Sequence, residues 1–225
     1  MIKVVLLDVD NTLMDFRECA HQAMHFAAEE WGLTLPANIT QVFHRINDGL
    51  WHRIEEGSLT VPRLHEIRWG LIFEELGIDR DGVEFEQRFL KNLAKGSATV
   101  EGAKELLEYL APKYTLCVAS NAPYYQQTSR LTNAGLLGYF DHLFISEKIG
   151  FSKPKPEFFE ACMKELEGVS KEEIMMIGDS LTADIGGAAA FGLQTCWFNF
   201  SGAPKEQGSG ADHTVDRLEE IKNIL

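Results

Sequence analysis

The stretch Ile2-Lys3-Val4-Val5-Leu6-Leu7-Asp8-Val9-Asp10-Asn11-Thr12-Leu13 lies at the start of the sequence. Its first half, Ile2–Leu7, is a short and almost continuous apolar run, rich in β-branched residues, that ends abruptly in acids. This pattern is typical of a strand that is buried on both faces of a parallel sheet. The sequence therefore predicts that the chain opens with such a strand and that two carboxylates follow its carboxyl end.

Similar apolar runs recur along the second half of the chain and alternate with stretches of helical periodicity. The further strands are predicted at Thr115–Ala119, Leu143–Ile145, Ile174–Ile177 and Thr195–Phe198. The helices are predicted at Glu101–Leu110, Tyr125–Ala134, Pro156–Leu166 and Thr182–Phe191. Alternating strands and helices indicate βαβ units, so the predicted fold class is α/β with a doubly wound parallel sheet.

The stretch between the first strand and the rest of the sheet breaks this rhythm. It carries four helix-period segments and no convincing buried strand, with breaks at Gly32, Gly57-Ser58 and Gly77 to Gly82. We therefore predict an α/β core formed by residues 1–14 and 96–225, with an all-helical domain, residues 15–95, inserted after the first strand. The stretch Ser201–Gly210, rich in Gly and Ser, is predicted to be a flexible loop.

Composition limits the classes of partner. The formal net charge is −13, from 34 acidic and 21 basic residues, so the surface repels a nucleic-acid polymer. No apolar run approaches the ~20 residues needed to cross a bilayer, and the first acid comes too early for a signal peptide. The four cysteines form no CxxC pair. We expect a cytoplasmic protein without a membrane or nucleic-acid partner; a local cationic pocket could still bind a small phosphorylated substrate.

Asp8 and Asp10 are the first candidates for chemistry. Strand alternation sends both side chains to one side if the chain stays extended, at the edge where open α/β sheets bind ligands. Two close carboxylates repel each other unless a cation or a shared proton relieves them. The pair therefore indicates one carboxylate on a metal and one that moves protons; the alternative is a solvated turn after a strand.

The stretch Gly178-Asp179-Ser180-Leu181-Thr182-Ala183-Asp184 repeats this arrangement after another buried run. Asp179 is predicted at the tip of the strand, and Asp184 about one helical turn later. A cluster of carboxylates is what a hard ion such as Mg²⁺ prefers. A helix N-cap is the alternative explanation, and Ser180 or Thr182 fits it well.

Two weaker signals occupy equivalent places. Ser120-Asn121 ends a predicted strand and could offer a hydroxyl and amides to a phosphoryl oxygen, and Lys153 could offset phosphoryl charge. Alone, the first is more often a turn and the second a solvated surface charge. Each signal nevertheless lies next to the end of a different predicted strand, and such convergence is how a doubly wound sheet builds an active site.

Together these residues resemble the four motifs of the haloacid dehalogenase-like superfamily of phosphotransferases. The matching stretches are Asp8-Val9-Asp10-Asn11-Thr12, Ser120-Asn121, Lys153-Pro154 and Gly178-Asp179 through Asp184. The resemblance covers essentially the whole chain. It implies a Rossmann-like core with a helical cap, Mg²⁺ as cofactor, and hydrolysis of a phosphomonoester through an aspartyl-phosphate intermediate.

The resemblance also implies a role for each acid. Asp8 would be the nucleophile and a magnesium ligand, and Asp10 the general acid and base, with its backbone carbonyl on the metal. Asp179 would be the third protein ligand. Asp184 would support the site without binding the ion directly.

The remaining motif residues would bind the phosphoryl group. Ser120 would donate a hydrogen bond to it, with help from Asn121 and from the first loop, which includes Asn11 where many members have Gly. Lys153 would steady both the nucleophile and the phosphoryl charge. Four aromatic residues are expected to pack in the interior of the cap more often than against a substrate base: Phe16, Trp31, Trp51 and Trp69. Phe16, just after the catalytic loop, is the best candidate for an exception.

The stretches Asp8–Phe16, Ile145–Pro156 and Thr195–Asn199 resemble more narrowly the subgroup that acts as pyrimidine 5′-nucleotidases. A sugar-phosphate or phosphoglycolate phosphatase, or a phosphosugar mutase, uses the same motifs and stays an alternative. A receiver-type signalling module is a more distant one, because such modules are shorter and accept phosphate later in the chain. A dehalogenase would lack Asp10. We expect a small phosphorylated substrate and a monomer or homodimer.

Overall fold

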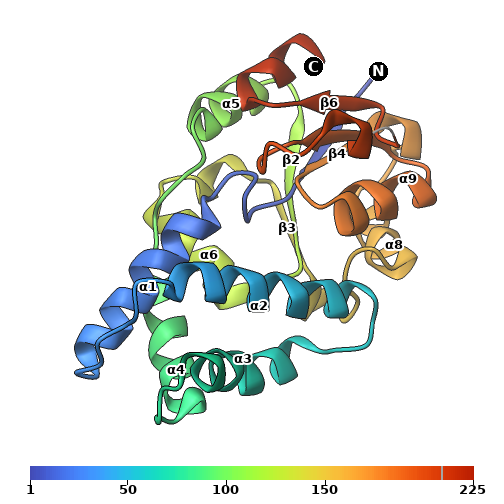
Figure 1. Ribbon diagram of the computed structural model, residues 1–225. Coiled ribbons are helices and arrows are strands. Elements are labelled where there is room, and N and C mark those ends of the chain that lie inside the picture. The colour runs from blue at the N-terminus through green and yellow to red at the C-terminus, as the bar shows by residue number, and fades with distance from the viewer. Residues whose placement is uncertain (209) are drawn as a thin grey trace. The chain divides into compact units, whose positions relative to one another are not determined.

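The computed structural model describes residues 1–208 and 210–225, which form two compact units (Figure 1). The core unit comprises Met1–Phe16 and Ser97–Leu225, and the helical unit comprises Arg17–Gly96. The helical unit is thus an insertion in the core sequence. Each unit has a hydrophobic interior of its own.

The core unit is built on a parallel sheet with strand order β3-β2-β1-β4-β5-β6. The strands are β1 (Val4–Leu7), β2 (Thr115–Ser120), β3 (His142–Ile145), β4 (Ile174–Gly178), β5 (Gln194–Phe198) and β6 (His213–Val215). This confirms the predicted doubly wound α/β fold. The edge strand β6 was not predicted, because it has only three residues and two of them are half-buried.

The strand order places the first strand in the middle of the sheet, between β2 and β4. Leu7 at its end pairs with Val118 of β2 and with Ile177 of β4. The next residue, Asp8, donates its backbone N–H to the carbonyl of Ile177. The direction of winding reverses at this point, and doubly wound sheets bind their ligands just beyond such a switch point.

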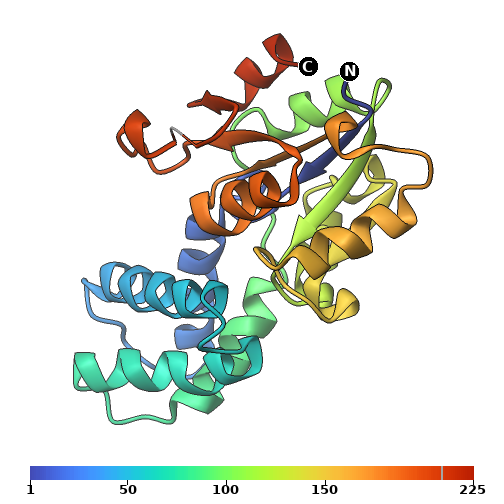
Figure 2. The ribbon, with the colours of Figure 1, turned by 90° about the vertical axis from the view of Figure 1, so that its right-hand side faces the viewer.

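Helices cover both faces of the sheet (Figures 1 and 2). The core helices are α5 (Ala103–Leu110), α6 (Tyr124–Asn133), η1 (Leu137–Tyr139), α7 (Ser146–Ile149), α8 (Pro156–Glu165), η2 (Lys171–Glu173), η3 (Leu181–Gly186), α9 (Gly187–Phe191), η4 (Lys205–Gly208) and η5 (Leu218–Asn223). Figure 1 shows α5 and α6 on one side of the sheet and α8 and α9 on the other. Phe158 and Phe159 of α8 and Ala188 of α9 pack on Leu6 and Met176 of the sheet.

Two predicted segments differ in detail. The helix predicted at Thr182–Phe191 is a six-residue π-helical turn, η3, that continues into α9. The stretch 201–210, predicted to be a flexible loop, contains the 3₁₀ helix η4, and Ser209 within it lies outside the described residues.

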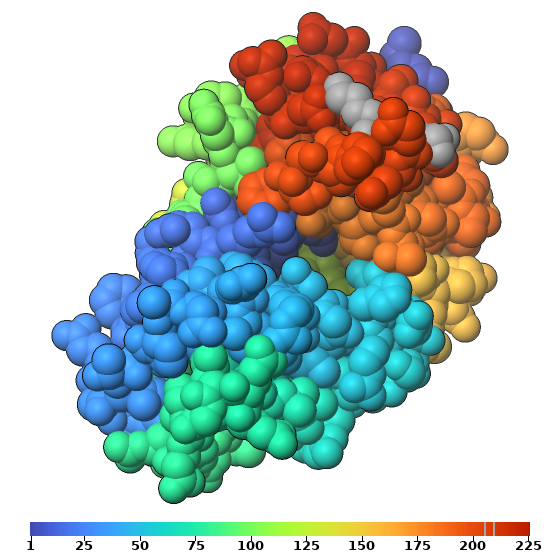
Figure 3. All heavy atoms as spheres, in the orientation of Figure 1, coloured from blue at the N-terminus to red at the C-terminus, as the bar shows by residue number. Residues whose placement is uncertain are grey.

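The helical unit contains the helices α1 (Phe16–Glu30, of which Phe16 belongs to the core unit), α2 (Ile39–Glu55), α3 (Val61–Leu76) and α4 (Gly82–Leu93). Thr60 caps α3, and Asp81 caps α4 by accepting from the N–H groups of Val83 and Glu84. A Cβ on Gly82 would lie 2.3 Å from the backbone nitrogen of Gly70, so a glycine is required where α3 and α4 approach. Side chains of α2 form much of the face of this unit seen in Figure 3.

Aromatic side chains fill the interior of the helical unit. Trp69 of α3 is fully buried, and its ring centroid lies 4.4 Å from Phe85, 5.4 Å from Phe89 and 5.5 Å from Phe43. These residues recur at helical spacing because each helix turns one apolar stripe inward. None of the helices within residues 1–208 and 210–225 is both long and apolar enough to span a lipid bilayer.

A charged pair is buried beside these aromatic rings. Arg68 of α3 donates to both carboxylate oxygens of Glu86 on α4, at 2.6 and 3.2 Å, and to the side-chain oxygen of Asn47 at 2.8 Å. The imidazole of His65 lies 2.8 Å from the same carboxylate. Arg68 and Glu86 are each 2% exposed, so removing one partner would leave the other charge buried and unpaired.

We expect Glu86→Ala to destabilise the helical unit by about 3–5 kcal/mol, because the Arg68 guanidinium would lose its buried carboxylate. Glu84→Ala is the matched control: this glutamate lies on the same helix, but its pair with Arg88 is exposed, so the loss should stay within about 0.5 kcal/mol. Urea unfolding followed by tryptophan fluorescence and circular dichroism measures both. Equal effects of the two substitutions would contradict the prediction.

Candidate active site

Three carboxylates meet beyond the carboxyl ends of the central strands. Asp8 follows β1, Asp179 follows β4, and Asp184 lies in η3. One carboxylate oxygen from each lies within 4.8 Å of the others. The fold therefore brings Asp8 together with two acids that lie more than 170 positions later in the sequence.

Lys153 holds two of these acids from one side. Its ammonium donates to Oδ1 of Asp8 at 2.8 Å, to Oδ1 of Asp184 at 2.6 Å, and to the carbonyl oxygen of Ala119 at the end of β2. The lysine is 2% exposed. It is therefore a buried cation with all three N–H groups engaged, not the solvated surface charge that a lone lysine usually is.

Asn121 fixes the segment that carries this lysine. Its side-chain oxygen accepts from the backbone N–H of Lys153 at 2.9 Å, and its side-chain nitrogen donates to the backbone carbonyl of Lys153 at 2.8 Å. The side-chain amide predicted to help bind phosphate is thus engaged with the Lys153 backbone. Its position explains why an asparagine follows Ser120: the amide provides one donor and one acceptor in a single plane.

The loop after β4 is held from two directions. The indole nitrogen of Trp197 on β5 donates to the backbone carbonyl of Asp179 at 2.9 Å. Oδ2 of Asp184 accepts from the backbone N–H of Ser180 at 3.1 Å, and Ser180 caps η3 through the N–H of Ala183, as the capping alternative predicted. A Cβ on Gly178 would lie 2.1 Å from Oδ2 of Asp184, so glycine is needed before Asp179.

Asp10 lies in a different environment from Asp8. Its Oδ1 accepts from Nη1 of Arg130 at 2.5 Å, and its Oδ2 accepts from Nε2 of Gln127 at 2.7 Å. The Asp10 side chain is 28% exposed, whereas Arg130 is 1% exposed. Gln127 and Arg130 were not predicted. The only signal in the sequence was their spacing, three positions apart in the helix after Ser120. Polar residues with that spacing more often face solvent.

The other predicted phosphate-binding residues surround the same loop. Oγ of Ser120 accepts from the N–H of Ala122 at 3.2 Å and from Gln127 at 2.9 Å. Asn11 adopts a left-handed conformation with φ of 59°, which turns the chain after the two acids. Its side-chain oxygen is buried without a hydrogen-bond partner among the described residues.

Phe16 lies at the start of α1, after this turn. The guanidinium carbon of Arg130 lies 5.8 Å from the centre of its ring, within the range of a cation–π contact. Arg130 thus contacts both Phe16, the predicted aromatic candidate, and Asp10.

Burial raises the pKa of Asp8 to about 7: Lys153 lowers it, while the charges of Asp184 and Asp10 raise it further. Burial also raises the pKa of Asp179 well above its ordinary value, with added repulsion from Asp8 and Asp184. Burial acts to lower the pKa of Lys153, but Asp184 and Asp8 outweigh it, so that pKa is raised. A cation among these oxygens would favour the ionised carboxylates and lower the first two pKa values.

The donor set fits a hard divalent cation. Within the part of the chain that the structure describes, four carboxylates, those of Asp8, Asp10, Asp179 and Asp184, gather around two cationic side chains: Lys153 pairs with Asp8 and Asp184, and Arg130 pairs with Asp10. A divalent ion would balance the formal charge of this group. Carboxylate and carbonyl oxygens are the ligands that Mg²⁺ prefers.

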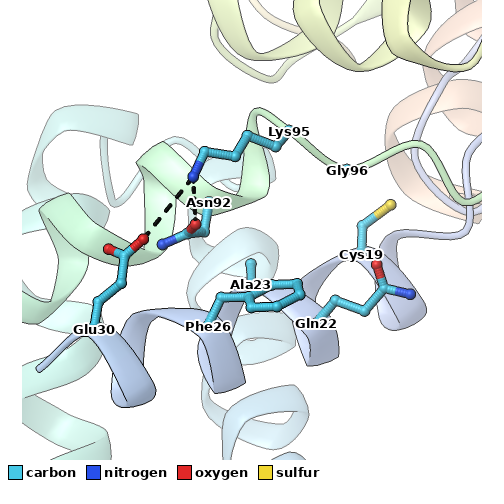
Figure 4. A pocket seen from close by; sticks show the side chains of 8 residues that line it. All are labelled: Cys19, Gln22, Ala23, Phe26, Glu30, Asn92, Lys95 and Gly96. Atoms are coloured by element: carbon cyan, nitrogen blue, oxygen red, sulfur yellow. Dashed lines mark hydrogen bonds and ion pairs between the residues drawn. The ribbon is translucent and has the colours of Figure 1, made fainter. Parts of the chain in front are cut away.

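A separate pocket of about 210 Å³ lies within the helical unit, between α1 and the end of α4 (Figure 4). Apolar Ala23 and Phe26 line it together with polar side chains. The ammonium of Lys95 donates to the side-chain oxygen of Asn92 at 2.9 Å and lies 3.9 Å from the Glu30 carboxylate. The eight residues that line this pocket all belong to the helical unit, and the motif residues are not among them.

Comparison with known proteins shows one consistent family. A family model describing haloacid dehalogenase-like hydrolases matches residues 2–192. The solved structure of the HAD-hydrolase YfnB from Bacillus subtilis, bound to magnesium, has a TM-score of 0.93 and 32% identity, and the match covers 100% of this chain and 98% of that one.

Among the relatives with named activities, two are pyrimidine 5′-nucleotidases. The pyrimidine 5′-nucleotidase PynA of Streptococcus pneumoniae is 35% identical over 198 residues, which are 88% of this chain and 84% of PynA. The pyrimidine 5′-nucleotidase YjjG of Escherichia coli is 27% identical over 221 residues, which are 98% of this chain and 96% of YjjG.

We expect Mg²⁺ to bind this carboxylate cluster, and isothermal titration calorimetry with MgCl₂ to detect it. Asp179→Asn should weaken Mg²⁺ binding most. Among the contacts described above, the Asp179 carboxylate pairs with neither Lys153 nor Arg130, so its charge is available to the ion. Asp184→Asn should weaken it by about 10- to 100-fold, the usual loss for a group that supports a metal ligand, since both Asp184 oxygens already accept hydrogen bonds. Glu219→Gln, an equal charge change at an exposed site, is the control. A larger loss in Asp184→Asn than in Asp179→Asn would contradict the assignment.

Proposed function

The chain belongs to the haloacid dehalogenase-like hydrolase family, and we propose that it is a magnesium-dependent phosphomonoester hydrolase that acts through a phosphorylated Asp8. The observation that carries this proposal is the division of labour between two neighbouring acids. Asp8 is held by Lys153 within a carboxylate cluster, whereas Asp10 is bound by neutral and cationic side chains of α6. One acid suits a nucleophile beside a cation, and the other suits proton transfer.

In the first step, a carboxylate oxygen of Asp8 attacks the phosphorus atom, and the bond from phosphorus to the leaving oxygen breaks. Asp10 gives its proton to that oxygen, so the product leaves as an alcohol. Lys153 fixes the orientation of Asp8 and offsets negative charge as the phosphoryl group arrives. Mg²⁺, held by Asp8, Asp179 and the backbone carbonyl of Asp10, would supply charge neutralisation between the anionic nucleophile and the anionic substrate.

In the second step, Asp10 accepts a proton from water, and the resulting hydroxide attacks the phosphorus atom of the aspartyl phosphate. The bond between phosphorus and the Asp8 oxygen breaks, which releases inorganic phosphate and regenerates the Asp8 carboxylate. Ser120 donates to a phosphoryl oxygen in both steps, together with backbone N–H groups at the start of the first loop, because the N–H groups from Asn11 to Met14 already donate to backbone carbonyls. The magnesium bound in the related YfnB structure supports the choice of metal.

We infer that the substrates are pyrimidine nucleoside 5′-monophosphates. The similarity to PynA and YjjG over most of the chain supports this substrate class. Phe16 supports it physically, because a flat base can pack against an aromatic ring. Recognition through apolar contacts and few hydrogen bonds predicts a broad preference among bases.

The mechanism is tested by phosphate release with and without Mg²⁺. Wild-type protein should release phosphate only with the metal present, and chelation should abolish turnover. Asp8→Asn should keep the fold, because the side chains are nearly isosteric, and lose all measurable turnover. Asp10→Asn should slow turnover by about 10²- to 10⁴-fold, the usual share of a general acid–base group. Full activity in chelator, or in purified Asp8→Asn, would overturn the mechanism.

The substrate class is tested by comparing kcat/KM for uridine and thymidine 5′-monophosphates with that for sugar phosphates and phosphoglycolate. The pyrimidine nucleotides should be preferred. Phe16→Ala should raise KM for nucleotides more than KM for p-nitrophenyl phosphate, which has no base. A sugar phosphate or phosphoglycolate preferred over every pyrimidine nucleotide would refute the nucleotidase proposal and leave the phosphatase proposal standing. Turnover of a sugar bisphosphate without phosphate release would indicate a mutase.

A further inference from the structure

Two buried residues of α6 contact the proposed acid–base group Asp10, and one of them, Gln127, also contacts the proposed phosphate-binding hydroxyl of Ser120. We propose that Gln127 and Arg130 are positioning residues that hold Asp10 and Ser120 in their working orientations. This inference rests on the proposed function, since it assigns a task to residues next to that site. It concerns side chains that none of the four sequence motifs contains.

Asp10 is held by both of its oxygens. Arg130 donates to Oδ1 at 2.5 Å and Gln127 donates to Oδ2 at 2.7 Å, so rotation of the carboxylate would break both hydrogen bonds. Each carboxylate oxygen has two acceptor positions, and the second remains for a proton in transit. The side chain of Asp10 is 28% exposed and therefore accessible, whereas Arg130 is only 1% exposed and Gln127 is fully buried. The partly exposed acid is therefore held by two buried side chains.

The amide of Gln127 has only one satisfactory orientation. Its nitrogen donates one hydrogen to Asp10 and one to Oγ of Ser120 at 2.9 Å, and its oxygen accepts from Nη1 of Arg130 at 3.3 Å. The opposite orientation would place the amide oxygen against a carboxylate and its NH₂ group against a guanidinium, which can only donate. Both hydrogens and the oxygen of this buried amide are thus used.

The same contact determines what Ser120 can do. A hydroxyl group has two acceptor positions and one hydrogen. Oγ of Ser120 accepts from Gln127 and from the backbone N–H of Ala122. With both acceptor positions filled, the hydroxyl must direct its hydrogen to a third group, as a ligand for a phosphoryl oxygen should. Gln127 therefore links proton transfer at Asp10 to phosphate binding at Ser120.

This arrangement predicts an effect that depends on the leaving group. An alkyl ester needs a proton on its departing oxygen, whereas p-nitrophenolate leaves without one, and kcat/KM reports the steps up to this departure. The experiment measures kcat/KM of Gln127→Met, Arg130→Met and Arg130→Lys for p-nitrophenyl phosphate and for the alkyl phosphate that the wild-type protein hydrolyses fastest. Thermal unfolding of each variant checks that it folds.

In Arg130→Met, kcat/KM for the alkyl ester should fall by about 10- to 100-fold and that for the aryl ester by less than about 3-fold, because only proton transfer is misplaced. Arg130→Lys should recover part of the loss, since it keeps a charge without the planar fork. Gln127→Met should lower the ratio of alkyl to aryl kcat/KM as well, and should also raise KM for both esters through Ser120. If Arg130→Met does not fold, the inference is tested by Arg130→Lys and by Gln127→Met, which changes no charge.

Gln126→Met is the matched control, because it makes the same chemical change one position earlier, and its ratio should stay at the wild-type value. In an Asp10→Asn background, Arg130→Lys and Gln127→Met should no longer alter the ratio, since the group they position is gone. The inference would be overturned by equal losses for both esters, by an altered ratio in Gln126→Met, or by undiminished effects in the Asp10→Asn background. In each of these cases, hydrolysis by the wild-type protein would still support the proposed function. A wild-type protein that hydrolyses no phosphomonoester would refute both.

Discussion

The ammonium group of Lys153 is the contact on which the arrangement of the site depends. It joins Asp8 after β1, the carbonyl of Ala119 in β2 and Asp184 in η3. A buried cation is costly unless all its hydrogens find acceptors, and three carboxylates this close repel one another without a cation. The lysine and the acids therefore stabilise each other only in this geometry. Asn121 reinforces it by binding the Lys153 backbone through both ends of its amide.

Asp8 and Asp10 are two positions apart, yet the structure gives them opposite surroundings. Asp8 is buried among other carboxylates; burial raises its pKa to about 7, with Lys153 acting to lower it and repulsion from Asp184 and Asp10 acting to raise it further. Asp10 is partly exposed and accepts hydrogen bonds from an arginine and an amide. Environments that differ in this way are how one fold assigns different tasks to identical side chains. The left-handed turn at Asn11 directs the chain away from the sheet immediately after the second acid.

The two units are stabilised by different interiors. The core unit packs its helices on a parallel sheet that is apolar on both faces, and the charged motif residues gather beyond the carboxyl ends of its strands. The helical unit packs aromatic rings against one another and buries the Arg68–Glu86 pair among them. A separate interior allows the sequence of the insertion to change without disturbing the strands that hold the motif residues. The motif residues accordingly all lie in the core unit.

The sequence by itself determined the fold class and the four motifs, because buried strands, helical periodicity and glycine breaks are local signals and each motif directly follows a strand. It also marked Asp8, Asp10, Ser120, Lys153 and Asp179 as residues that would converge at one edge of the sheet. Only the tertiary structure decided which other side chains support them. The sequence alone does not distinguish three of them, Gln127, Arg130 and Trp197, from ordinary helix and strand residues. Periodicity identifies the apolar face of an element, but it does not predict which group a polar side chain will contact. Arg130 contacts a residue 120 positions away and Trp197 one that is 18 positions away, while Gln127 reaches from α6 back to Ser120 at the end of the preceding strand. These contacts are determined only by the packing of α6 and β5 against the central strands.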